Sequence, residues 1–207
     1  MQTTKQNNLK RQQIINSAIT EFGVHSYNDA SLNRLSREGN FSKGIIYHYF
    51  KNKDELYLAC VSECFESLTA FLNRATISFD NVENATKTYL SLRQQFFNQH
   101  PKFSNIFANA LFHPPEHLKS DIHTLKSKLD QFNYDFYEKV LQNVNLKAYV
   151  SFEEAMEYFK FFQESFNYYF QTQDDEVFEQ SIQKHEIKLE KILKFMFYGI
   201  IKEETPE

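Results

Sequence analysis

Glycine and proline are scarce in this chain, with four of each among 207 residues, and no proline precedes Pro101. Long stretches without either residue, and without the alternation that strands show, favour helices throughout. The sequence also lacks an apolar run of 18 residues, so we expect no membrane-spanning segment. The first ten residues are polar and lack the apolar core of a signal peptide, and we therefore predict a cytoplasmic protein.

Cysteine is nearly absent, since only Cys60 and Cys64 occur. Their four-residue spacing on one predicted helix suits neither a relaxed disulfide nor a complete metal site. We interpret both as small buried hydrophobic residues, and a redox or metal-sensing role stays open. Three histidines, at 113, 117 and 123, are separated by Pro114-Pro115 and by a spacing that fits no single helix face. We predict no metal and no cofactor.

Periodicity and capping residues predict an all-α fold of about nine helices. Ser31 and Ser42 are expected N-caps, and the pairs Asn52–Glu55, Asp80–Glu83 and Ser151–Glu154 have the capping-box pattern. The expected helices cover about 5 or 9 to 22, 32–38, 43–49, 53 to 74 or 77, 81–98, 101–113, 115–143, 152–171 and 175–202. We divide them into a domain of residues 1–52 and a larger domain of residues 53–207.

Charge is distributed unevenly. The net charge of the whole chain is −4, but residues 1–53 hold eight Lys or Arg against three Asp or Glu. That segment is therefore net positive by five charges, and the remainder is net negative by nine. A basic end on an acidic body is typical of a protein that binds a polyanion with one end only.

Residues 31–53 contain the most informative pattern: two short helices joined by a tight turn at Gly39-Asn40, which is a helix-turn-helix. Ile46 and Phe50 share the inward face of the second helix, together with Ser42 and Tyr49. Its outward face presents Gly44, Tyr47 and His48, flanked by Lys43 and Ile45. We expect this face to enter the major groove of double-stranded DNA, with lysines 43, 51 and 53 near phosphates, and with His48 and Asn33 near base edges.

The segment Ser42-Lys43-Gly44-Ile45-Ile46-Tyr47-His48-Tyr49-Phe50-Lys51-Asn52-Lys53, followed by Asp54-Glu55-Leu56, closely resembles the recognition helix and the next cap of the TetR/AcrR family of bacterial transcriptional regulators. The resemblance covers residues 9–60. It implies an N-terminal three-helix DNA-binding domain and a C-terminal helical domain for ligand binding and dimerisation. Carried over by position, the implied DNA-contacting residues are Ser31, Asn33, Ser42, Lys43, Gly44, Ile45, Tyr47, His48, Tyr49 and Lys53.

Two departures from the family pattern matter. Family members usually have Ala-Gly-Val before the recognition helix, whereas this chain has Gly39-Asn40-Phe41. Asn40 still tolerates the left-handed backbone of the turn, and Phe41 enlarges the small core. The position after Gly44 is more often Thr or Ser, and here it is Ile45. An apolar contact replaces a hydroxyl, so no family operator sequence transfers to this chain.

The larger domain is expected to form a homodimer and a ligand pocket. The interface is predicted on the last two helices, whose apolar residues recur every three and four positions: Ile182, Leu189, Leu193, Met196 and Ile200 on one, and Phe152, Met156, Phe159, Phe166, Tyr169 and Phe170 on the other. Ten aromatic residues fall within 149–170, more than one core-facing stripe accommodates. The predicted ligand-binding residues are Phe96, His100, Phe103, Phe107, Tyr134, Tyr137, Phe159, Phe162, Gln163 and Phe166.

Three functions are compared. The first is a transcriptional repressor that a small hydrophobic molecule releases from a palindromic operator. The second is a TetR-like structural DNA-binding protein controlled by a protein partner instead of an inducer. The third is an enzyme, which we reject because the sequence has no Glu-x-x-His pair, no Gly-rich phosphate loop and no nucleophile elbow. The operator, the inducer and the choice between repression and activation are not encoded in any recognisable pattern.

Overall fold

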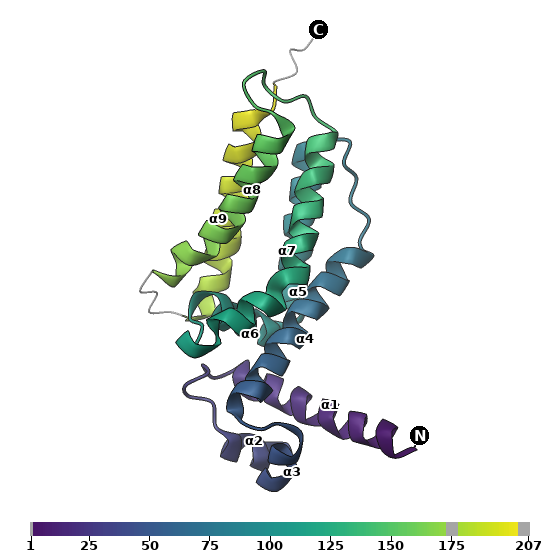
Figure 1. Ribbon diagram of the computed structural model, residues 1–207, viewed down its shortest axis with the longest axis vertical. Helices are drawn as coiled ribbons and strands as arrows, with labels where there is room; N and C mark the ends of the chain where they lie inside the picture. The colour runs from purple at the N-terminus through teal and green to yellow at the C-terminus, as the bar shows by residue number, and fades with distance from the viewer. Residues whose placement is uncertain (1, 173–177, 203–207) are drawn as a thin grey trace. The chain divides into compact units, whose positions relative to one another are not determined.

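The computed structural model describes residues 2–172 and 178–202, and these residues form nine α-helices and one short 3-10 helix (Figure 1). Strand-type pairing in this part of the chain is limited to one bridge between Leu146 and Ile201. The helices are α1 (Gln2–Phe22), α2 (Leu32–Glu38), α3 (Lys43–Tyr49), α4 (Lys53–Arg74), α5 (Val82–Gln99), α6 (Pro101–Phe112), η1 (Glu116–Leu118), α7 (Lys119–Gln142), α8 (Phe152–Gln171) and α9 (Phe178–Ile200). The predicted all-α fold is confirmed.

Most predicted helix ends lie within one residue of those in the structure, and four differ. The first helix begins at Gln2 instead of residue 5 or 9. Asn81, not Asp80, caps α5: its side chain accepts a hydrogen bond from the amide of Asn84 at 3.0 Å. The long helix expected from residue 115 begins with the 3-10 turn of η1, and α7 starts at Lys119. The last helix ends at Ile200, because the amide of Lys202 already bonds to Asn145. Its predicted start at residue 175 lies outside the described residues.

The chain divides into two compact units. The first consists of residues 1–66 and 100–126, so α6 belongs with the three N-terminal helices. Gly23 shows how closely α6 and α1 approach, since a Cβ at Gly23 would lie 2.7 Å from the Cβ of Lys102. Asn105 donates a hydrogen bond to the carbonyl of Gly23 at 2.7 Å. The core of this unit includes Ile14, Ile15, Phe22, Leu56, Tyr57 and Phe107, each at most 2% exposed.

Both cysteines are buried in the first unit and carry free thiols. Burial raises the pKa of Cys60 and Cys64 far above the ordinary thiol value, which keeps them protonated. The thiol of Cys64 donates to the carbonyl of Phe103 at 3.4 Å. These features agree with the interpretation of both residues as small buried hydrophobic side chains.

The second unit consists of residues 67–99 and 127–207 and contains a buried ion pair. Arg93 of α5 donates two hydrogen bonds to the carboxylate of Glu186 of α9, at 2.8 and 2.7 Å. Burial alone would raise the pKa of Glu186, but the Arg93 guanidinium and His185 lower it to about 2. The arginine also lies 3.5 Å from the hydroxyl of Tyr89. This paired network fixes the register of α5 against α9, because an unpaired charge is costly at this depth.

No helix among the described residues is both long enough and apolar enough to cross a membrane.

Candidate nucleic-acid interface

The turn between α2 and α3 takes its shape from Asn40. Asn40 is the only non-glycine residue with positive φ in the described chain, at 52°. Gly39 has an ordinary right-handed backbone, with φ −80°, so its lack of a side chain serves packing rather than backbone freedom. A Cβ at Gly39 would lie 2.5 Å from the ring of Phe41. The Phe41 ring can therefore occupy this position only because residue 39 has no side chain.

Two serine caps begin the helices as predicted. The hydroxyl oxygen of Ser31 accepts from the amide of Arg34 at 3.5 Å, and that of Ser42 accepts from the amide of Ile45 at 3.2 Å. An accepting hydroxyl still has its own O–H to donate. Each serine thus caps the N-terminus of its helix and retains its O–H as a donor for a phosphate oxygen.

The structure places Ile46 and Phe50 on the inward face of α3 as predicted, but Ser42, which was expected on the same face, is exposed. Ile46 and Phe50 are each 1% exposed and pack into the first unit. Asn33, Lys43, Gly44, Ile45, Tyr47 and His48 are exposed. A Cβ at Gly44 would meet only the hydroxyl oxygen of Ser42, at 3.8 Å. Nothing within the protein therefore requires glycine at position 44, and its bare backbone faces outward.

Tyr49 and Ser31 are half-buried, so they lie at the margin of this face. The ring of Tyr49 meets that of His48 edge-on, with centroids 5.0 Å apart. This contact limits the directions open to the exposed imidazole. His48 is thereby held on the outward side of α3.

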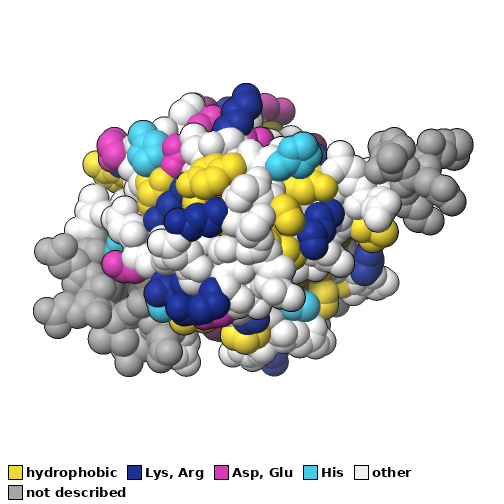
Figure 2. Space-filling model, turned by 90° about the horizontal axis from the view of Figure 1, so that it is seen from below, with side chains coloured by type: hydrophobic (Ala, Val, Ile, Leu, Met, Phe, Trp, Pro, Cys, Tyr) yellow, Lys and Arg dark blue, Asp and Glu magenta, His cyan; other side chains and the backbone are white. Residues whose placement is uncertain are grey.

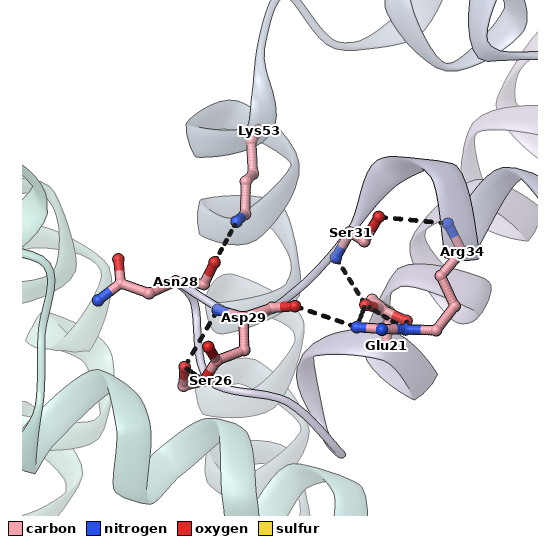
Figure 3. A network of polar contacts seen from close by, with 7 residues as sticks. All are labelled: Glu21, Ser26, Asn28, Asp29, Ser31, Arg34 and Lys53. Atoms are coloured by element: carbon pink, nitrogen blue, oxygen red, sulfur yellow. Dashed lines mark hydrogen bonds and ion pairs between the residues drawn. The ribbon is translucent and has the colours of Figure 1, made fainter.

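Lys53, at the start of α4, is held by the loop before α2. Its Nζ donates to the carbonyl of Asn28 at 3.4 Å (Figure 3) and lies 4.7 Å from the centre of the Tyr27 ring. The Tyr27 hydroxyl in turn donates to the carboxylate of Asp54. Burial lowers the pKa of Lys53, and the nearby acids oppose that shift. The ammonium group of Lys53 is thus held in place by Asn28 and Tyr27, and two of its three N–H donors remain for a phosphate.

An ion pair between the partly exposed Arg34 and the buried Glu21 ties α1 to α2 beneath this loop. Glu21 accepts from Arg34 Nε at 2.8 Å and from the backbone amide of Ser31 at 2.7 Å, as Figure 3 shows. Arg34 also reaches the carbonyl of Asp29 at 3.0 Å. Burial alone would raise the pKa of Glu21, but these hydrogen bonds hold it below its ordinary value. The Glu21 carboxylate therefore accepts a hydrogen bond from the N-cap amide of α2 and, through Arg34, fixes α2 against α1.

Lys10 and Arg11 are two cations that the sequence prediction left out of the site. Lys10 Nζ lies 4.6 Å above the centre of the Phe41 ring, and the guanidinium of Arg11 lies 4.9 Å above that of Phe50. Phe41 and Phe50 flank α3 on either side, so both cations are held beside the recognition helix. Basic residues just before the apolar pattern of α1 are the signal that would have found them.

Figure 2 looks onto the α2–α3 face of the first unit. Lys and Arg side chains are spread across it, and acidic side chains are fewer and lie mostly near its edge. This agrees with the positive charge of residues 1–53. Such a surface attracts the phosphates of a nucleic acid.

The predicted ligand-binding residues are divided between the two units. His100, Phe103 and Phe107 belong to the first unit, and the other seven belong to the second. Within the second unit, the rings of Tyr137 and Phe159 stack at 4.3 Å, and those of Phe162 and Phe166 lie 5.1 Å apart. Gln163 donates to the carbonyl of Asp130 at 3.4 Å. A ligand pocket at these residues stays a prediction.

Comparison with known proteins agrees with the geometry of the first unit. Residues 14–60 match the family described as bacterial regulatory proteins, tetR family. The chain is 26% identical over 132 residues to the negative transcriptional regulator of the biofilm operon icaADBC, IcaR, of Staphylococcus epidermidis, which covers 64% of this chain and 68% of that protein. It is 34% identical over 65 residues to the transcriptional repressor Rv1474c of Mycobacterium tuberculosis, which covers 31% of this chain and only 35% of that protein.

Two solved structures share the fold over almost the whole chain. A TetR family regulator from Chloroflexus aurantiacus has a TM-score of 0.57 and 17% identity, and the match covers 95% of each chain. A second such regulator, from a Shewanella species, has a TM-score of 0.59 and 14% identity, covering 94% of this chain and 99% of that one. At such identities the likeness concerns the fold alone.

Proposed function

The chain belongs to the TetR/AcrR family of bacterial transcriptional regulators, and we propose that this DNA-binding regulator is a homodimeric repressor that a small hydrophobic molecule releases from a palindromic operator. The exposed face of α3, with Gly44 open to solvent and the cations around it, carries the proposal. Its inward face is fully used in packing, so the outward face is free for DNA.

On this proposal, residues of the α3 face divide into two roles. Lys43 and Lys53 bind phosphates, together with Lys10 and Arg11 beside the flanking rings, and Tyr47 donates its hydroxyl to a phosphate. Asn33 and His48 reach base edges in the major groove, and Ile45 makes an apolar contact such as one with a thymine methyl group. Phosphate contacts set the register of the helix, and base contacts select the sequence.

Dimerisation is supported by an exposed aromatic surface on α8 and α9, which we call the aromatic face. Its members are each between 42% and 76% exposed: Tyr158, Phe161, Tyr168 and Tyr169 on α8, and Ile187, Phe195 and Tyr198 on α9. Figure 1 draws the two helices side by side. So many exposed aromatic side chains at helical spacing are typical of a surface that another protein covers. A second copy would present the same face, as a two-fold dimer requires.

The proposed aromatic face shares Tyr169 with the interface that the sequence predicted, but most of the other predicted interface residues do not belong to it. Leu189 and Leu193 are 5% and 0% exposed, and Phe159 and Phe166 are also buried. These residues pack within the protomer, so they are not available to a partner. Periodicity alone favoured this other stripe because each helix has two apolar faces.

The operator follows from the dimer. Two α3 helices related by a two-fold axis read two half-sites in inverted orientation, about 10 base pairs apart or at a multiple of that spacing. A ligand dissociates the complex only if it binds the DNA-free geometry more tightly than the DNA-bound one.

The test is to capture fragmented bacterial genomic DNA on the purified chain and to sequence the bound fragments. We expect an inverted repeat, and we expect Tyr47→Ala to weaken binding to it by about 1–3 kcal/mol. Tyr149→Ala is the matched control, because Tyr149 is 73% exposed and belongs to the second unit. Bound fragments without a common repeat, or equal loss in both variants, would contradict the proposal. Screening uncharged hydrophobic compounds for loss of the complex tests the inducer.

A further inference from the structure

Tyr27, in the loop before α2, contacts side chains from α4 and from η1. Its ring meets the rings of Tyr57 and His117 edge-on, with centroids 5.1 and 5.9 Å apart. Its hydroxyl donates to the carboxylate of Asp54, and the ammonium group of Lys53 lies 4.7 Å from the centre of its ring. All five residues belong to the first unit. A loop side chain with contacts on so many sides is held in one orientation.

The hydroxyl end of Tyr27 is fixed by a carboxylate that two residues share. Oδ1 of Asp54 accepts the Tyr27 hydroxyl and lies 3.4 Å from Nε2 of His117. The hydrogen bond from Tyr27, followed by that from His117, lowers the pKa of Asp54, so Asp54 stays ionised and accepts strongly. Burial and this carboxylate raise the pKa of Tyr27 to about 12, so the hydroxyl keeps the proton that it donates.

Lys53 is held by neutral groups only. Its two contacts are with the Tyr27 ring and the carbonyl of Asn28, and neither carries a charge that would neutralise the ammonium group. Lys53 is also the first residue of α4, where the dipole of a helix favours an anion. A free lysine side chain loses rotamer freedom when it binds a phosphate, and holding it in place beforehand reduces that cost.

We propose that Tyr27 positions Lys53 for a DNA phosphate, and that Asp54 and His117 keep the Tyr27 ring in place. His117 belongs to η1, between α6 and α7, so the phosphate contact depends on a residue outside the helix-turn-helix. The inference rests on DNA binding by the first unit, which is part of the proposed function. It does not depend on the dimer, the operator or the inducer.

The first test measures binding to a fluorescein-labelled duplex of mixed sequence, by anisotropy at several salt concentrations. Phosphate contacts do not require a particular sequence, so no operator is needed. Lys53→Met removes the charge, and it should weaken binding and lower the salt slope by about 1 for each lysine in contact with a phosphate. Tyr27→Leu leaves the charge in place. It should weaken binding by about 2- to 10-fold for each lysine, with an unchanged salt slope.

The second test observes Lys53 directly in the free protein. The methylene protons next to its Nζ should resonate at unusually high field, because the Tyr27 ring lies beneath the ammonium group. Tyr27→Leu should remove this shift, whereas Tyr27→Phe keeps the ring and should retain both the shift and most of the affinity. Phe79→Leu is the matched control. It removes a ring 5.8 Å from Lys139 Nζ in the second unit, and it should bind the duplex like the wild type.

A variant at His117 tests the contribution of η1 with little risk to the fold. The His117 side chain is 57% exposed, so His117→Ala should fold normally. It should weaken duplex binding less than Tyr27→Leu does, because it removes only one support of the ring. In the Tyr27→Leu background it should have no further effect, since the two residues act through the same contact.

Unchanged affinity in Tyr27→Leu, or no high-field shift of Lys53 in the wild type, would overturn the proposal. A salt slope lowered as far as in Lys53→Met would overturn it too, because a loss of positioning leaves the charge in place. Additive effects of Tyr27→Leu and His117→Ala would refute the role of η1. A wild type that binds no duplex overturns the proposed function together with this inference, whereas the preceding results leave the proposed function standing.

Discussion

Gly44→Ala separates the stability of the fold from DNA binding, because the two should change in opposite directions. The added methyl group would meet only the Ser42 hydroxyl oxygen, at 3.8 Å, which is an ordinary contact. Alanine is favoured over glycine within a helix by about 1 kcal/mol. We therefore expect the free energy of unfolding to rise by about 0.5–1 kcal/mol.

DNA binding by the same variant should weaken. The bare backbone at Gly44 lies between the exposed Lys43 and Tyr47 on the outward side of α3. A methyl group there would hold the helix away from the groove wall and lengthen the contacts beside it. We expect a loss of about 1–3 kcal/mol, the size of one well-formed contact, which corresponds to roughly 5- to 150-fold in affinity.

Urea denaturation measures the stability, and fluorescence anisotropy with the selected operator measures affinity at one fixed salt concentration. Gly199→Ala is the control, because no atom lies within 4 Å of a Cβ placed there in α9. It should gain stability like Gly44→Ala and bind DNA like the wild type, with an unchanged elution volume. Unaltered operator affinity in Gly44→Ala would refute the assignment of this face, and a loss of stability would refute the reasoning about its surroundings.

Three further predictions concern the dimer, the turn and acid stability. Phe195→Glu should elute as a folded monomer with weakened operator binding. Leu193→Glu should instead lose several kcal/mol of folding stability, because the introduced charge is buried. A dimeric Phe195→Glu variant would show that the dimer interface does not include Phe195. Gly39→Ala should cost about 1–3 kcal/mol through its clash with Phe41, and adding Phe41→Val should recover part of that cost in urea denaturation; strict additivity would contradict the coupling. The pKa of Glu21 is lowered on folding, so the ionised carboxylate stabilises the folded state. This contribution to folding stability is present above the unfolded pKa, about 4.5, and is lost as pH falls through the folded value. Glu21→Gln should therefore cost about 1–3 kcal/mol at pH 7, and its stability should fall less than that of the wild type upon acidification; parallel curves would exclude this role.

The helix-turn-helix was predictable because its signals are local. Ser31 and Ser42 each accept a bond from an amide three residues ahead, which depends on sequence spacing alone. Asn40 adopts the left-handed backbone that its residue type tolerates. The role of Gly39 was not predictable in the same way, because it depends on where the Phe41 ring folds back.

The surfaces of the second unit were not predictable from the pattern. α8 and α9 each carry apolar residues on more than one side, and periodicity does not say which stripe meets the protomer's own core. Leu193 and Phe195 are two positions apart, yet one is 0% and the other 76% exposed.

The proposed dimer also makes release by a small ligand energetically accessible. Shifting a repressor from 99% bound to 99% free requires about a 10⁴-fold preference of ligand for the free state, or about 5.5 kcal/mol. A dimer with one ligand site in each protomer would divide this preference between two sites, so each needs only about 100-fold, or about 2.7 kcal/mol. A drug-sized ligand gains about 0.3 kcal/mol per non-hydrogen atom, and one neutral hydrogen bond gives about 0.5–1.5 kcal/mol. Losing one hydrogen bond and a few apolar contacts in the DNA-bound geometry is therefore enough to supply the required difference at each site.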